Sequence, residues 1–189
     1  MSLVNTTIAT PEAMGELCRN FYAEYLSEGP GGILLLEGDL GAGKTTFCHG
    51  FNQALGITDT INSPTFNLLN EYRGERGLLY HYDLYRMADP EEVVEAGFSE
   101  LWEAVYALDV GDPTKAGRGA GGAGRAIHAV EWWRRAGDYM PVGIHTYRVR
   151  IAWEQGADNK GGSLDTEEEL RRVVIDRLES WADLDNDDE

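Results

Sequence analysis

Residues 34–46 read LLLEGDLGAGKTT and carry the most informative pattern in this chain. Residues 38–45 fit the phosphate-binding pattern G-x-x-x-x-G-K-[ST]. The apolar run before it, residues 33–36, predicts a buried strand, and residues 46–55 predict a helix. In that setting the glycines let backbone N–H groups surround phosphate oxygens at the positive end of the helix. The stretch therefore predicts a nucleoside triphosphate site.

The pattern also assigns roles to its side chains. Lys44 would reach the β- and γ-phosphates, and the Thr45 hydroxyl would ligate Mg²⁺. Thr65 follows Ser63-Pro64 and is a candidate switch residue that could contact the metal or the γ-phosphate, although the same turn could serve only to direct the chain. The predicted nucleotide-binding residues are Asp39, Leu40, Gly41, Ala42, Gly43, Lys44, Thr45, Thr46 and Thr65.

Two acids stand where predicted strands end. Asp83 stands near the end of the run 78–84, and Glu131 follows the apolar run 126–130. Ligands of open α/β sheets gather outside the carboxyl ends of strands, so both acids could converge on a metal near Thr45. The alternative for each is an exposed acid in a surface ion pair. The residues alone leave the roles of His81 and Arg86 open.

Composition restricts the partners. The chain has 33 acidic and 16 basic residues and a net charge of −17, and it has few dense basic spots, of which Arg134-Arg135 is one. Proteins that bind nucleic acid by themselves usually present a basic patch, so direct RNA or DNA binding is not expected. No apolar run reaches the roughly 20 residues of a membrane span. We expect a cytoplasmic protein with no membrane partner, in which Cys18 and Cys48 are buried core residues.

The order of elements predicts an α/β, three-layer fold of the P-loop NTPase type. The runs 66–72 and 78–84 flank a short turn and predict a β-hairpin, so the central sheet should be mixed and mainly parallel. We expect a single domain over residues 1–182, with a glycine-rich surface loop at about 109–124. Residues 164–181 predict a last helix, and the acidic residues 183–189 predict a disordered tail.

The base is expected to be adenine. Asn159-Lys160-Gly161-Gly162 is close to the guanine-recognition pattern N-K-x-D, but it lacks the aspartate that would pair with the guanine edge. The predicted cofactors are therefore ATP and Mg²⁺.

Four motifs together resemble the TsaE family, also called YjeE. They are GDLGAGKTT at 38–46, SPTF at 63–66, HYDLYR at 81–86 and EW at 131–132. The resemblance covers residues 31–97 closely and resumes near Glu131. The chain departs from the family pattern in its long glycine-rich stretch and in Trp133, where a proline often stands.

The resemblance implies a slow Mg²⁺-dependent ATPase required for threonylcarbamoyladenosine modification of adenosine 37 in tRNA. It implies docking onto the TsaB–TsaD complex, which ATP turnover would reset between cycles, so that tRNA is met only through that complex. It also implies that Lys44, Asp83 and Glu131 are catalytic and that Thr45, Asp83 and Glu131 hold the metal. Two alternatives stay open: a P-loop small-molecule kinase, and a nucleotide-dependent binding module with negligible hydrolysis.

Overall fold

The computed structural model describes residues 1–64, 67–109, 125–154 and 170–185. Within these ranges the strands are β1 (Ser2–Ile8), β2 (Gly31–Glu37), β3 (Leu69–Arg73), β4 (Leu78–Asp83), β5 (Ala126–Glu131), β6 (Thr146–Glu154) and β7 (Leu170–Leu178). The α-helices are α1 (Pro11–Phe21), α2 (Lys44–His49), α3 (Phe51–Leu55), α4 (Glu92–Glu95), α5 (Phe98–Asp109) and α6 (Ala182–Asp185). A π-helical turn, η1 (Tyr22–Leu26), extends α1, and a 3₁₀ segment, η2 (Trp133–Tyr139), follows β5.

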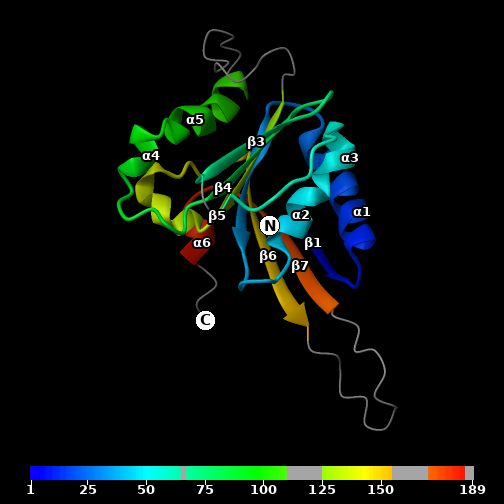
Figure 1. The fold of residues 1–189 in the computed structure, drawn as a ribbon. Helices are drawn as coiled ribbons and strands as arrows, with labels where there is room; N and C mark the ends of the chain where they lie inside the picture. The colour runs from blue at the N-terminus through cyan, green and yellow to red at the C-terminus, as the bar shows by residue number, and fades with distance from the viewer. Residues whose placement is uncertain (65–66, 110–124, 155–169, 186–189) are drawn as a thin grey trace, which may run out of the picture.

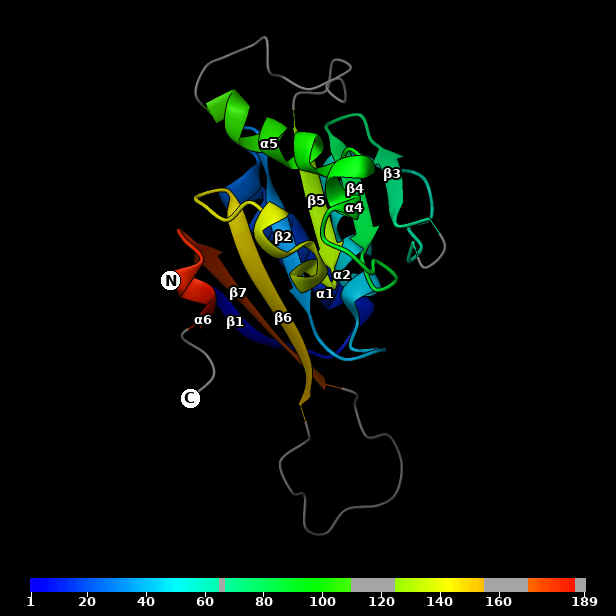
Figure 2. The same ribbon diagram turned by 90° about the vertical axis from the view of Figure 1, so that its left-hand side faces the viewer.

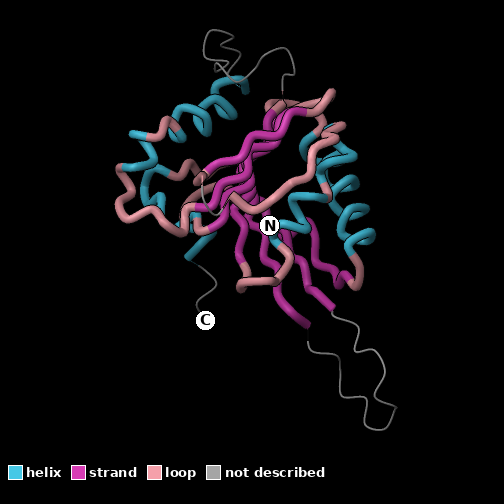
Figure 3. The backbone as a smooth tube through the Cα atoms, in the orientation of Figure 1, coloured by secondary structure: helices cyan, strands magenta, loops and turns pink. Residues whose placement is uncertain are grey.

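The strands form one mixed sheet (Figures 1 and 3), and their order in it is β1-β7-β6-β2-β5-β4-β3. Its centre is parallel, because β2 pairs in parallel with both β5 and β6, and β5 pairs in parallel with β4. The edges are antiparallel: β3 pairs with β4, and β7 pairs with β6 and β1. The predicted mixed α/β sheet with a hairpin is therefore confirmed.

Helices cover both faces of the sheet and make three layers (Figure 2). The residues of β2 alternate between the two cores: Leu34 and Leu36 pack with α1, α2 and α3, whereas Ile33 and Leu35 pack with α4, α5 and η2. A central strand covered on both faces has no solvent side, which explains why its sequence is a continuous apolar run. This arrangement fixes the loop after β2 at the edge where the parallel strands end.

The prediction of a last helix over 164–181 was wrong. Residues 170–178 form β7, in which Val173 and Ile175 are fully buried, and residues 164–169 lie outside the described part of the chain. Pairing with both β1 and β6 satisfies the strand's backbone on two sides, which outweighs the helix-start signal of the preceding acids. The strand β1 was not predicted. Its sequence is largely polar and lacks the apolar run of a buried strand, and most of its residues are at least partly exposed.

The first residues of the tail predicted at 183–189 are part of a short helix. Asp183, Leu184 and Asp185 belong to α6, and Leu184, with 6% exposure, packs in the same core as the buried residues of α5. Most of the glycine-rich stretch, residues 110–124, and the near-guanine motif at 159–162 lie outside the described residues. No helix in the described part of the chain is long and apolar enough to cross a membrane.

Candidate functional site

The phosphate-binding pattern forms the turn between β2 and α2. Gly38, Gly41 and Gly43 have φ values of 147°, 81° and 112°, in the region that residues with a Cβ rarely adopt. A Cβ on Gly38 would also lie 2.3 Å from the carbonyl oxygen of Ile151 in β6. The loop therefore depends on glycine for its backbone path, and no side chain caps α2 at Gly43.

Lys44 ties the loop together. Its Nζ donates to the carbonyl oxygens of Gly38, at 2.8 Å, and Asp39, at 3.1 Å. The same atom lies 3.6 Å from Oε2 of Glu131, and the side chain is only 9% exposed. The ammonium group thus sits inside the loop, where a phosphate oxygen could replace the carbonyl contacts.

The two predicted acids lie on neighbouring strands. Glu131 pairs in register with Leu36 on one side and with Asp83 on the other. Both carboxylates are largely buried, and Oδ1 of Asp83 accepts a hydrogen bond of 3.1 Å from the Tyr85 N–H. The structure therefore brings Lys44, Glu131 and Asp83 to one edge of the sheet.

A buried histidine holds Glu131. His81, in β4, has no exposed surface, and its Nε2 lies 2.9 Å from Oε1 of Glu131. Burial lowers the pKa of His81, but Cys48 and the hydrogen-bonded Glu131 outweigh burial and raise the pKa above its ordinary value. Each oxygen of Glu131 therefore has a nitrogen partner, His81 Nε2 on Oε1 and Lys44 Nζ on Oε2.

The remaining predicted residues occupy different environments. Thr45 and Thr46 are half-buried in the first turn of α2, and Ala42 is fully buried. Asp39, Leu40 and Gly41 form the exposed tip of the loop. Thr65 lies outside the described residues, and Arg86 is an exposed residue after β4.

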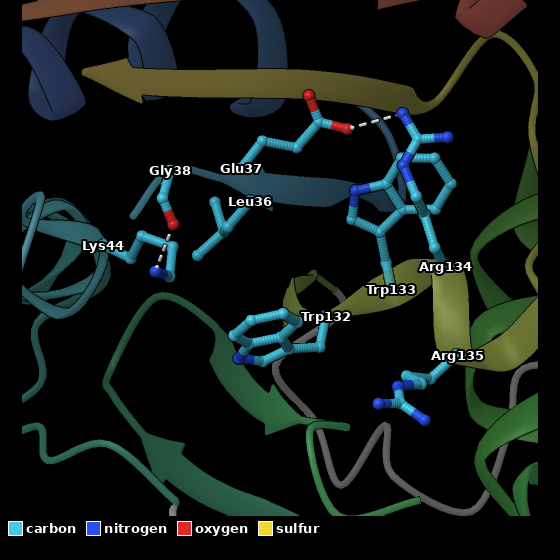
Figure 4. A pocket seen from close by; sticks show the side chains of 8 residues that line it. All are labelled: Leu36, Glu37, Gly38, Lys44, Trp132, Trp133, Arg134 and Arg135. Atoms are coloured by element: carbon cyan, nitrogen blue, oxygen red, sulfur yellow. Dashed lines mark hydrogen bonds and ion pairs between the residues drawn. The ribbon is translucent and has the colours of Figure 1, made fainter. Parts of the chain in front are cut away.

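A pocket of about 540 Å³ opens beside Lys44 (Figure 4). It is lined by Leu36, Glu37, Gly38, Lys44, Trp132, Trp133, Arg134 and Arg135. Arg134 stacks on the Trp133 ring at 4.4 Å and pairs with Glu37 at 3.2 Å. Three cations and one acid line this wall, which suits an anionic ligand although the whole chain is strongly acidic.

Trp132 lines this pocket and has an unusual backbone conformation. Its φ of 57° places a non-glycine residue in the left-handed region, which costs roughly 1–2 kcal/mol. The side chain remains 47% exposed and lies with its ring centroid 5.0 Å from that of Tyr85. The turn after Glu131 thus holds an aromatic ring at the surface next to the phosphate loop.

The described side chains of the site do not form a complete metal site by themselves. Among the described residues, no group of three or more His, Cys, Asp or Glu side chains is arranged to hold a metal ion. Mg²⁺ usually binds through one or two carboxylates together with water and phosphate oxygens, rather than in an all-protein cage. Thr45, Asp83 and Glu131 could serve such a metal only together with a bound phosphate.

Several residues of the site were not predicted. The pairing of His81 with Glu131 depends on the register of β4 and β5, which no local pattern gives. The pocket residues Trp133, Arg134 and Arg135 come together through the 3₁₀ segment after β5. The one signal in the sequence that could have indicated this pocket was the cluster of tryptophan and arginine at 132–135, directly after the candidate metal ligand Glu131.

Comparisons with known proteins match the part of the chain that holds the phosphate loop. Residues 8–115 match the family model of "Threonylcarbamoyl adenosine biosynthesis protein TsaE". The tRNA threonylcarbamoyladenosine biosynthesis protein TsaE of Nostoc sp. is 52% identical over 117 residues, which are 62% of this chain and 59% of the relative. The protein of the same name from Bacillus subtilis is 59% identical over 63 residues, 33% of this chain and 40% of that protein.

A solved structure extends the likeness. The crystal structure of Bacillus subtilis YdiB matches with a TM-score of 0.53 and 26% identity over 93% of this chain and 86% of that chain. The alignments to the Nostoc and Bacillus TsaE proteins span less than two thirds of those proteins' own length. Because the family model covers more than half of the chain and includes the phosphate loop and β4, the chain belongs to the TsaE family of threonylcarbamoyl adenosine biosynthesis proteins.

Proposed function

We propose that this chain is a Mg²⁺-dependent ATPase that serves threonylcarbamoyladenosine modification of tRNA. In this proposal it docks onto the TsaB–TsaD complex and resets it between modification cycles by hydrolysing ATP. The observation that carries the proposal is the position of Lys44, whose ammonium group contacts both the start of the loop, at Gly38 and Asp39, and the strand-end acid Glu131. Membership of the TsaE family gives the process in which the hydrolysis is used.

The loop would bind the phosphates of ATP. Lys44 would exchange its carbonyl partners for β- and γ-phosphate oxygens, and the backbone N–H groups around Gly41 and Gly43 would provide further contacts. Thr45, Asp83 and Glu131 would hold Mg²⁺ against those phosphates, where the metal neutralises the charge that develops during phosphoryl transfer.

The two acids would divide the work. Glu131 is bound by His81 and Lys44, so its carboxylate is held in one orientation. The Asp83 carboxylate accepts a hydrogen bond from the Tyr85 N–H and has no such pair of nitrogen partners among the described residues, so it is the better candidate to orient the attacking water. Both contributions act through position and charge, which dominate phosphoryl transfer.

The net charge supports an indirect contact with tRNA. A chain of charge −17 would be repelled by the phosphate backbone, so a partner protein must carry the nucleic acid. Docking onto TsaB–TsaD meets that requirement.

The test compares phosphate release from ATP by the purified chain alone and with the cognate TsaB and TsaD. We expect a slow rate alone and a faster rate when both partners are present. A rate that is unchanged by the partners would overturn the regulatory role, even if hydrolysis itself is observed.

A small-molecule kinase is the alternative to this proposal, and the pocket beside Lys44 favours it over a binding module with negligible hydrolysis. Arg134 and Arg135 could hold an anionic acceptor next to the phosphate loop. Transfer of the γ-phosphate to a metabolite, at a rate indifferent to TsaB and TsaD, would establish this alternative.

A further inference from the structure

Trp153 and Arg171 form a cross-strand pair on the sheet. They are register partners in β6 and β7, and the guanidinium carbon of Arg171 lies 4.1 Å from the centroid of the Trp153 ring. Trp153 is 43% exposed, although its neighbour on the same face, Ile151, is buried in the core. A large exposed ring that is held by a planar cation offers a flat surface to a ligand.

This pair lies next to the phosphate loop. A Cβ on Gly43 would be 3.2 Å from Cδ of Arg171 and 3.3 Å from its Nε. The carbonyl of Ile151, two residues before Trp153, closely approaches Gly38 at the other end of the loop. Strands β6 and β7 therefore run along the loop and past the end of β2 (Figures 1 and 2).

The positions of the loop's neighbours set the direction of a bound nucleotide. Strands β5 and β6 flank β2 on opposite sides. Lys44 is turned toward Glu131 on β5, at 3.6 Å, so the outer phosphate of a triphosphate would lie on that side. The nucleoside must then leave the loop on the other side, toward β6 and β7.

We propose that the Trp153–Arg171 pair is the platform on which the base of the bound nucleotide stacks. This inference rests on the proposed function, because it requires a nucleotide in the loop. Indole and guanidinium groups present flat faces that match a purine ring, and Arg171 also brings positive charge to the phosphate end. Both residues lie beyond residue 115, where the match to the family model ends, so the platform is read from this chain's own strands.

The test separates binding of the base from binding of the phosphates. Isothermal titration calorimetry in the presence of Mg²⁺ measures the Kd values of ATP and of inorganic tripolyphosphate. The proteins compared are the wild type, Trp153→Ala and Trp153→Phe. Loss of base stacking should raise the Kd of ATP about tenfold in Trp153→Ala. The Kd of tripolyphosphate should change less than about twofold, and Trp153→Phe should recover most of the ATP affinity because it keeps an aromatic face.

Arginine variants complete the design. Arg171→Lys keeps the charge but loses the planar face, so it should weaken the binding of ATP more than the binding of tripolyphosphate. The matched control is Arg172→Ala, because Arg172 is the next residue on the same strand and contacts Asn5 instead, with its Nε 3.1 Å from Oδ1. This control should leave both Kd values unchanged.

The outcomes are distinct. A Trp153→Ala variant that binds ATP as tightly as the wild type, or that loses ATP and tripolyphosphate equally, overturns the platform and leaves the phosphate loop standing. A wild type that binds tripolyphosphate as tightly as ATP overturns the platform as well. A wild type that binds neither compound overturns the proposed function and the platform together.

Discussion

His128 should make the folded protein sensitive to acid. It lies in β5 with 1% exposure, and its ring stacks against those of Tyr80, at 4.9 Å, and Tyr82, at 5.9 Å. Its Nδ1 is 3.0 Å from the Tyr82 hydroxyl. Burial lowers the pKa of His128 from 6.5 to about 3, so the folded protein keeps this imidazole neutral over a range in which the unfolded chain protonates it.

The sign and size of the effect follow from this shift. A depressed folded pKa gives stability that is fully present above pH 6.5 and is lost as the pH falls toward 3. Each pH unit within that window removes about 1.4 kcal/mol. Between about pH 6.5 and about pH 4.5, this one side chain should remove roughly 2.7 kcal/mol of a typical total of 5–15 kcal/mol.

The perturbation is His128→Asn, which keeps a polar partner near the Tyr82 hydroxyl but cannot titrate. The assay is urea unfolding at several pH values, followed by tryptophan fluorescence. Loss of the ring should make the variant less stable at neutral pH by about 1–3 kcal/mol. The difference from the wild type should then shrink by roughly 2.7 kcal/mol as the pH falls from about 6.5 to about 4.5.

Tyr82→Phe is the control for this experiment. It removes the hydroxyl but leaves the buried imidazole, so its acid dependence should run parallel to that of the wild type. If the wild-type and His128→Asn curves also stay parallel, to within about 0.5 kcal/mol, the reasoning from burial is refuted.

Three further predictions concern the loop and the sheet. Glu131→Gln should lower the rate of ATP hydrolysis at least about tenfold, because Lys44 loses its acidic partner; wild-type phosphate release would remove Glu131 from the site. Gly31→Ala should cost about 3 kcal/mol or more in urea unfolding, since its Cβ would lie 1.9 Å from the Ala126 carbonyl oxygen and its φ is 108°. Gly15→Ala, on an open face of α1, should instead stabilise the protein by about 0.5–1 kcal/mol in the same assay, and equal effects of the two alanines would contradict the packing argument.

The parts of the fold that follow from local sequence could be predicted. The phosphate loop is continuous in the chain, and its flanking strand and helix appear in the apolar pattern on either side. The strand ends at Asp83 and Glu131 were likewise visible, because each acid directly follows an apolar run. Their proposed roles remain predictions, since no nucleotide or metal contact has been measured.

The parts that depend on pairing between distant strands could not be predicted. β7 was mistaken for a helix because Glu167, Glu168 and Glu169 resemble a helix start, whereas its strand character comes from neighbours at both edges. The contact of His81 with Glu131 and that of Arg171 with Trp153 both depend on registers that the sequence does not display. Local chemistry therefore predicted where the site begins, and long-range pairing determined which side chains complete it.

The most direct measurement of the central claim is phosphate release from Mg²⁺-ATP, with TsaB and TsaD present, by the wild type and Lys44→Ala. The structure places the Lys44 ammonium between the loop carbonyls and Glu131, so its removal takes away the group that would meet the β- and γ-phosphates. We predict a rate at least about a hundredfold lower for the variant, with an unchanged urea midpoint. Equal rates for the two proteins would contradict the account.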